Sequence, residues 1–309
     1  MVTSILRMAL PVLLTFAVGY LCKRLHVFSL EGLRALKAVV GNVTLPAVLF
    51  YAFWTAEYSA KIALTFTTVF VACGLGLLAG FALRRVAAPY GKFMPFLTTN
   101  FEGGMLGYSL FGLLYVGQTQ IFAMADIGQT VFAFTVFLTT LRAVSGKRAG
   151  AKALAGEMLR NPVLIAIVLG VLLGVSGVGR SLLATDAGLV LSDVVRFIAA
   201  PTSALILLIV GYELNFRRSM MRPVLATVGL RLVIMGVFFG LSVLVLFSLI
   251  PFDKPLFVAL LLAFSLPAPY IIPLYAEAED HAAYLSATLS AQTLVSLALF
   301  IAIAAYTLA

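Results

Sequence analysis

Long apolar segments follow one another along almost the whole chain, and this pattern constrains the fold more than any other feature of the sequence. A helix of about 20 apolar residues spans the hydrocarbon core of a bilayer. We place ten such spans, at residues 2–22, 38–56, 62–83, 93–117, 120–141, 161–179, 194–213, 222–250, 255–276 and 282–309. Hydrophobic residues make up 62% of the chain and charged residues only 11%, whereas a soluble domain has about 25% charged residues. The sequence therefore predicts an all-α integral membrane protein.

The net charge of +9 does not indicate a nucleic-acid ligand, because the basic residues form no continuous face. They stand in short clusters between apolar segments, and alternate connections hold most of them: Lys23, Arg24, Arg34 and Lys37; Arg84, Arg85 and Lys92; Arg142, Lys147, Arg148, Lys152 and Arg160; and Arg217, Arg218 and Arg222. By the positive-inside rule these connections face the cytoplasm, which places both termini outside it. The partner that composition implies is the lipid bilayer.

The chain divides into two similar halves, residues 1–141 and 161–309, joined by a basic connection at 142–160. Three landmarks recur in the same order at a slowly growing offset: Pro11 with Pro162, Pro46 with Pro201, and residues 127–130 with 290–293. Five spans are an odd number, so the second half enters the membrane from the opposite side. Such an inverted repeat is typical of secondary transporters, and we interpret residues 1–309 as one transport domain.

The fourth and ninth predicted spans occupy equivalent places in the two halves, and both contain helix-breaking residues near their middles. Residues 100–109 include Gly103, Gly104 and Gly107, and residues 266–273 include Pro267, Pro269 and Pro273. Glycine and proline weaken or break helices, although both are common in membrane spans. Paired interruptions bring half-helix N-termini, with their partial positive charge, to one point where an anion can bind. We predict a substrate site there, formed by Asn100, Glu102, Gly103, Gly104, Pro267, Pro269 and Tyr270.

Two acidic residues, Glu102 and Asp126, lie within predicted spans without being terminal residues of them. A charge inside a span is costly and persists mainly where it is used. Glu102 stands inside the first interruption, so we predict that it takes up a proton or helps to hold a coupling cation such as Na⁺. The alternative is that Glu102 caps an unwound turn. Asp126 is a second candidate for ion coupling, and a helix-start role near the outer end of its span is the alternative.

Several further polar residues belong to the predicted site or its surroundings. Gln129 and Gln292 occupy related positions on the spans next to the interruptions, so we expect them to line the site or to bond neighbouring helices. Asn42 and Thr44 precede Pro46 at a predicted kink and are placed near the cavity. Arg196 and Arg231 are candidate partners for a substrate carboxylate, but both fall near span ends, so we expect them to reach the membrane interface.

The motifs in this order resemble a known family of transporters. They are Gly19 and Tyr20 before the basic connection, residues 42–50, residues 160–162, Ala200 with Pro201, residues 211–214, and residues 266–268. The chain resembles a bacterial member of the auxin efflux carrier family, whose fold is related to that of bile acid sodium symporters. The resemblance covers nearly the whole chain. It implies ten helices, a scaffold part and a transport part, and crossing of the fourth and ninth spans around the substrate.

The resemblance also implies a function. Substrates of the family are organic anions, such as auxin in plants and malonate or malate in bacteria. We therefore expect a secondary carrier in a bacterial inner membrane that needs no cofactor. By analogy with the family, we expect a homodimer. This chain departs from the family pattern at two positions, with Glu102 where the family usually has Asn and Ser109 where it has Pro. An ionised Glu102 would repel a carboxylate unless a proton or cation neutralised it.

Three other functions remain open from the sequence. One is a sodium-coupled carrier of a larger amphipathic anion, and another is a channel or a receptor. The third is an intramembrane enzyme, which is disfavoured because the two histidines, His26 and His281, lie in connections and no metal-binding or Ser-His pattern is present. Cys22 and Cys73 have no metal or redox spacing, so we interpret them as packing residues.

Overall fold

The computed structural model describes residues 2–56, 58–146, 156, 160–214, 220–276 and 281–308, and within these ranges all regular structure is helical, with no strand. Six helices in these ranges are long and apolar enough to cross a membrane. They are Leu30–Trp54, Ala60–Ala87, Thr119–Ser145, Asp186–Glu213, Met221–Leu249 and Ala282–Leu308. The chain is therefore a helical, multi-pass membrane protein, as its apolar pattern predicted.

Short irregular segments interrupt the helices of the first half. In order, the elements are α1 (Val2–Arg24), α2 (Leu30–Val39), the π-helical η1 (Val40–Thr44), α3 (Leu45–Trp54), α4 (Ala60–Leu83), the 3₁₀ turns η2 (Arg84–Ala87) and η3 (Tyr90–Lys92), α5 (Met94–Leu97), the π-helical η4 (Gly103–Gly107), α6 (Tyr108–Leu114), α7 (Thr119–Phe132), the π-helical η5 (Ala133–Phe137) and α8 (Leu138–Ser145). Pro46 lacks the N–H of a continuous α-helix, and the wider turn of η1 directly precedes it.

The second half continues with α10 (Pro162–Val175), α11 (Val178–Leu183), α12 (Asp186–Ala199), α13 (Thr202–Glu213), α14 (Met221–Leu249), α15 (Lys254–Ser265), α16 (Ile272–Ala276) and α17 (Ala282–Leu308). Side chains directly before several helices fix where they begin. Asn161 accepts a hydrogen bond from the N–H of Val163 at 2.9 Å, and Asp253 accepts one from the N–H of Leu256 at 3.0 Å. These N-caps satisfy donors that have no partner inside the helix.

Two pairs of helices cross so closely that a glycine is required between their backbones. α1 packs along α13, and a Cβ at Gly19 would lie 2.1 Å from the carbonyl oxygen of Leu208. α3 packs along α10, and a Cβ at Gly170 would lie 2.7 Å from the carbonyl oxygen of Phe50. Small residues of this kind drive helix association in membranes, where burial of apolar surface contributes little. Each pair joins one helix of the first half to one of the second.

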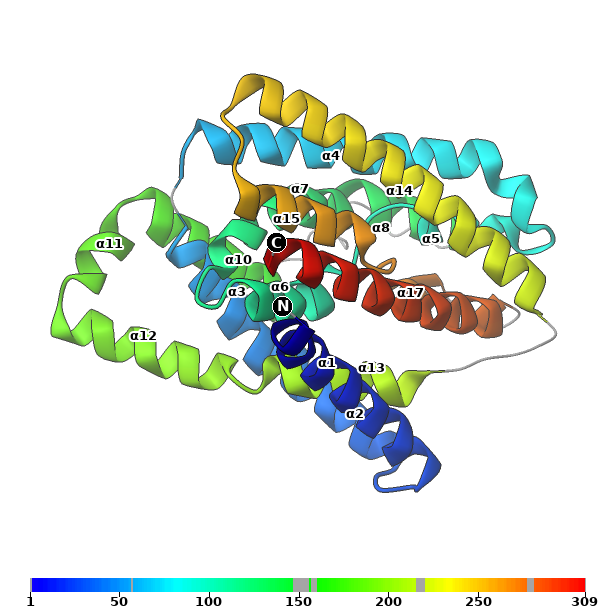
Figure 1. Ribbon diagram of the computed structural model, residues 1–309, viewed down its shortest axis with the longest axis horizontal. Coiled ribbons are helices and arrows are strands. Elements are labelled where there is room, and N and C mark those ends of the chain that lie inside the picture. Colours follow the sequence, from blue (N-terminus) through cyan, green and yellow to red (C-terminus); the bar gives the residue numbers. More distant parts are fainter. Residues whose placement is uncertain are drawn as a thin grey trace.

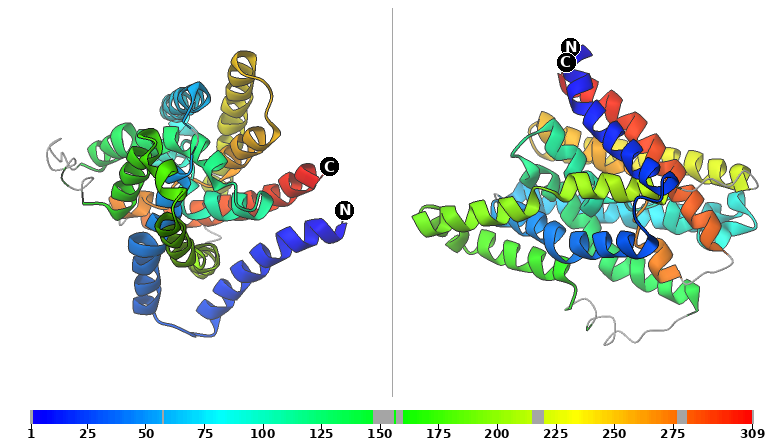
Figure 2. Two further views of the ribbon diagram at one scale, coloured as in Figure 1. Left: turned by 90° about the vertical axis from the view of Figure 1, so that its left-hand side faces the viewer. Right: turned by 90° about the horizontal axis from the view of Figure 1, so that it is seen from below.

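The remaining long helices form the other side of the molecule. α4 and α14 lie side by side along one edge, and α7, α15 and α17 pack beside them (Figure 1). The beginning of α1 and the end of α17 lie together at one end of the molecule (Figure 2).

The helices are interrupted close to both predicted places, but in the first half the non-helical residues precede the glycines, because Gly103, Gly104 and Gly107 lie in the helical η4. α5 ends at Leu97 and helical structure resumes at Gly103; α15 ends at Ser265 and α16 begins at Ile272. We call residues 98–102 the first break and residues 266–271 the second break. The first break is fully buried, as are residues 266–269 of the second, so their non-helical backbone lies inside the protein. This is the condition under which such backbone is tolerated at membrane depth.

Candidate functional site

The two breaks cross at Glu102. The backbone N–H of Glu102 donates to the carbonyl oxygen of Pro267 at 2.9 Å, and its Oε2 accepts a hydrogen bond from the N–H of Tyr270 at 2.7 Å. Tyr270 lies just before α16, where backbone N–H groups have no helical partner and favour a negative charge. Glu102 is only 9% exposed. Its carboxylate therefore caps the second half-helix of the opposite break from inside the protein.

Arg231 on α14 holds the other ends of both breaks. Its guanidinium donates to the carbonyl oxygens of Asn100 at 2.6 Å, Leu266 at 2.7 Å, and both Leu97 and Thr99 at 3.2 Å. These carbonyls lie at or just after the ends of α5 and α15, where backbone acceptors have no partner inside the helix. One buried cation thus satisfies the C-terminal ends of two half-helices.

Our expectation that Arg231 reaches the membrane interface is wrong, because the side chain is only 3% exposed and bonds to interior carbonyls. Its position could have indicated this. Arg231 lies ten residues after Met221, the start of α14, which corresponds to about 15 Å along a helix and to the middle of a hydrocarbon core of about 30 Å. Arg196, in contrast, is exposed on α12.

Gln292 on α17 joins the end of α5 to the second break. Its Nε2 donates to the carbonyl oxygen of Leu97 at 2.8 Å, and its Oε1 accepts from the N–H of Ala268 at 2.9 Å. Both amide atoms therefore bond backbone, so Gln292 lies at the predicted site and braces it. Gln129, its repeat-related partner in the sequence, instead donates from Nε2 to Oδ1 of Asp126 at 2.7 Å.

Asp126 forms a buried polar cluster with its own helix, beside the first break. Thr130 donates to its Oδ2 at 3.2 Å, in addition to the bond from Gln129 to Oδ1. A Cβ at Gly103 would lie only 1.9 Å from Asp126 Oδ1, so glycine is what permits this approach. The helix-start role weighed for Asp126 is wrong, because the residue is 1% exposed and lies inside α7, which begins at Thr119.

Asn100 adopts a left-handed backbone conformation, with φ of 56°, in the middle of the first break. The side chain is fully buried, and its Oδ1 accepts a weak bond from the Cys73 thiol at 3.7 Å. Its Nδ2 has no hydrogen-bond partner among the described residues. A buried donor without a partner is costly, so this amide is suited to meet a ligand or water.

The structure brings most of the other predicted residues to the crossing, but not all of them. Pro267 and Pro269 are buried in the second break, and Gly104 lies beside Glu102. Thr44 is buried, and its hydroxyl has no partner among the described residues. Asn42 is exposed and donates to the carbonyl oxygen of Ala38 in its own helix at 2.8 Å, so its side chain does not contribute to the crossing.

A cavity of about 230 Å³ lies against the second break. It is lined by Lys37, Val210, Glu213, Leu214, Tyr270, Pro273, Ser286, Leu289, Ser290 and Thr293. Tyr270 links this cavity to the crossing. Its hydroxyl bonds Thr293 Oγ1, another lining residue, at 2.8 Å, and its backbone N–H donates to the Glu102 carboxylate. Lys37, Glu213 and Thr293 were not predicted as site residues. Thr293 was detectable as the counterpart of Thr130 in the repeat, whereas no local signal pointed to the other two.

No protein-family model matches the sequence, and a search of curated proteins found no match.

Proposed function

We propose that this chain is a secondary carrier that moves a small organic anion, a carboxylate such as malonate, malate or an auxin-like acid, by alternating access. The observation that carries the proposal is the crossing of two buried, interrupted helices at Glu102, directly beside a small cavity. Interrupted helices with charged partners at their ends are the usual substrate and ion sites of secondary transporters. The site resides in the inner membrane of a bacterium, with both termini outside the cytoplasm.

Further support comes from how the two halves pack. We propose ten spans in two inverted repeats, 1–141 and 161–309. Under this arrangement α1 and α13 are the first and seventh spans, and α10 and α3 are the sixth and second. The two glycine-mediated crossings are then equivalent under the repeat, which accounts for their similar packing.

The coupling ion, H⁺ or Na⁺, binds at Glu102 and Asp126. The two side chains flank Gly103, which follows Glu102 in sequence and approaches Asp126 Oδ1 in space. Two buried carboxylates near one backbone position disfavour each other and an anionic substrate. A proton or cation taken up here removes that repulsion, so the substrate and the coupling ion bind together.

The size of the cavity favours a small substrate over a larger amphipathic anion. Pockets for drug-sized ligands have volumes of about 300–1,000 Å³, and this cavity is smaller. Hydroxyl groups of serine, threonine and tyrosine residues in its lining offer donors for a compact carboxylate.

The test is uptake of labelled malonate, malate and indole acetate into proteoliposomes under imposed proton or sodium gradients. We expect saturable, gradient-driven uptake with counterflow, which distinguishes a carrier from a channel. Glu102→Gln abolishes the dependence on the gradient. Glu31→Gln, at an exposed position in the first turn of α2, is the matched control and retains it. Wild-type protein that moves none of these anions under either gradient contradicts the proposal.

A further inference from the structure

The cavity beside the crossing connects two features that the proposed function does not yet join. Its inner wall contains Tyr270 and Thr293, and Tyr270 in turn holds the Glu102 carboxylate. Its lining also contains an ion pair between Lys37 on α2 and Glu213, the last residue of α13. A ligand that enters the cavity therefore meets a charged pair as well as the crossing.

Lys37 is the one cationic residue among the described residues that line this cavity. Both side chains of the pair are 40% exposed, so water reaches the ammonium and the carboxylate. Exposed ion pairs of this kind contribute little to stability and break readily. The pair is therefore suited to exchange partners.

The C-terminal end of α13 does not depend on Lys37 for a cation. Lys23, in the last turn of α1, donates to the carbonyl oxygen of Leu214 there at 2.6 Å. Lys23 thus satisfies the backbone at this helix end. Lys37 is not required there, and it lines the cavity.

We propose that Lys37 is an anion-binding residue of the entry cavity, paired with Glu213 while the cavity is empty and with the substrate carboxylate after entry. This inference rests on the proposed function. An ammonium group has three donors, so it can bind the incoming carboxylate before Glu213 leaves. Glu213 then remains in contact with water, which keeps the cost of the exchange small. The empty cavity stays neutral at this end, and a bound anion is selected by charge before it reaches Tyr270.

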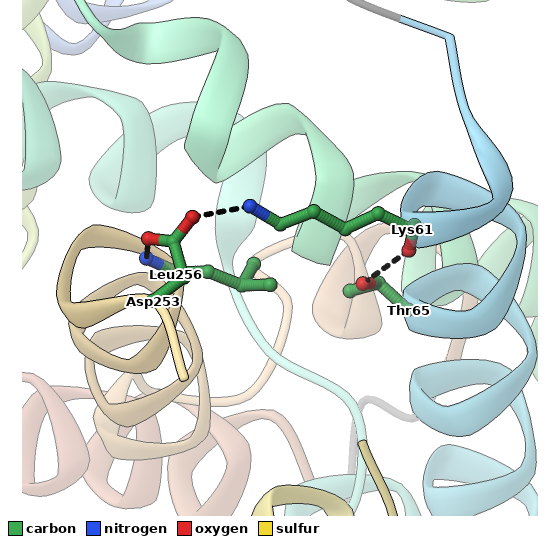
Figure 3. A network of polar contacts seen from close by, with 4 residues as sticks. All are labelled: Lys61, Thr65, Asp253 and Leu256. Carbon is green, nitrogen blue, oxygen red and sulfur yellow. Dashed lines mark hydrogen bonds and ion pairs between the residues drawn. The ribbon is translucent and has the colours of Figure 1, made fainter. Parts of the chain in front are cut away.

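A second lysine-acid pair provides a matched control. Lys61 at the start of α4 pairs with Asp253 before α15, and the second carboxylate oxygen of Asp253 caps α15 through Leu256 (Figure 3). The exposure of its side chains, 30% and 28%, is close to that of the first pair. Neither residue lines the cavity.

The experiment measures the KM and kcat of malonate uptake in proteoliposomes for Lys37→Gln, Glu213→Gln and the double variant. We expect Lys37→Gln to raise KM roughly fivefold with little change in kcat, in line with the loss of one half-exposed charge contact. Glu213→Gln lowers KM, because Lys37 is then free for the substrate, and the double variant resembles Lys37→Gln. Lys37→Arg keeps the charge and a KM near that of the wild type, and it serves as the test if Lys37→Gln does not fold.

The opposite pattern overturns the inference. If the pair is only a brace between α2 and α13, the two single variants are impaired alike, the double variant recovers, and Lys61→Gln with Asp253→Asn behaves the same way. Wild-type uptake with a KM that is indifferent to Lys37 refutes this inference alone. Absence of wild-type uptake of malonate and of the other anions refutes the proposed function as well.

Discussion

The first and second breaks are anchored alike but differ in their chemistry. Arg231 binds the backbone where each half-helix ends, and Gln292 bonds Leu97 at the end of α5 and Ala268 in the second break. The first break has carboxylates of its own: Glu102 lies within it and Asp126 beside it. The second break contains no carboxylate, and its charged neighbours come from other elements: Glu102 at the Tyr270 N–H, Arg231 at the Leu266 carbonyl, and the Lys37–Glu213 pair across the cavity. Charge is therefore built into the first break and supplied from elsewhere to the second.

The two breaks also differ in the residue type that accompanies the loss of helical structure. Directly after the first break, Gly103 gives space and admits the Asp126 carboxylate to the backbone. In the second, Pro267 and Pro269 remove N–H donors, which leaves the remaining groups to bond side chains from elsewhere. We therefore propose that ion coupling belongs to Glu102 and Asp126 at the first break, whereas the second break contributes Tyr270 to the wall of the cavity.

The largest expected effect comes from replacing Arg231, whose guanidinium bonds carbonyl oxygens of both breaks. In Arg231→Leu, four carbonyl oxygens lose a donor at once. That of Leu97 keeps its bond from Gln292, and each of the others that is left unpaired costs about 1–3 kcal/mol. We expect a loss of stability of at least ~3 kcal/mol, seen as a much lower midpoint of thermal unfolding in detergent or as failure to accumulate.

Arg196→Leu is the matched control, because Arg196 is exposed on α12, and its unfolding midpoint should stay near that of the wild type. Equal midpoints for the two arginine variants would show that Arg231 does not hold the breaks together.

The next effect separates the first break from the second. Gly103→Ala places a methyl group 1.9 Å from Asp126 Oδ1, so either the carboxylate or the break must shift. We expect about 1–3 kcal/mol of destabilisation, as for other overpacked interiors, and loss of gradient dependence in uptake assays. Gly104→Ala is the control from the adjacent position, where the nearest atom to the new Cβ is 3.7 Å away. If both variants lose coupling equally, contact between Gly103 and Asp126 is not the reason.

Much of the fold could be predicted from the sequence, because its main determinants are local. Apolar length predicts a helical membrane protein, proline predicts the second break, and glycine predicts the neighbourhood of the first. The position of Glu102 in a break likewise followed from its neighbours. Each of these inferences uses residues close together in the chain.

The partners in the site could not be predicted in the same way, because they lie far apart in the sequence. Arg231 bonds residues more than 130 positions earlier in the chain, and the Lys37–Glu213 pair joins residues 176 positions apart. The repeat suggested equal roles for Gln129 and Gln292, but Gln292 bonds the end of α5 and the second break, whereas Gln129 bonds Asp126 in its own helix. Equivalent positions in a repeat predict location better than they predict bonding partners.

The smallest expected effect concerns Asp253, which directly precedes α15 in the second interrupted segment. Asp253 caps α15, whereas α5 of the first segment begins after Phe93 without a side-chain cap. Burial alone would raise the pKa of Asp253, but the hydrogen bonds from Lys61 and the Leu256 N–H outweigh it and lower the pKa below its usual 3.8. A carboxylate with a lowered pKa in the folded state stabilises the protein above its unfolded pKa. That contribution is lost as the pH falls through the folded pKa.

We expect Asp253→Asn to cost at most about 1 kcal/mol at neutral pH. In unfolding midpoints measured from pH 7 downwards, the difference from wild type should shrink as the acid range is reached. If the midpoints of wild type and Asp253→Asn differ by the same amount at every pH, the charge of Asp253 does not contribute to stability.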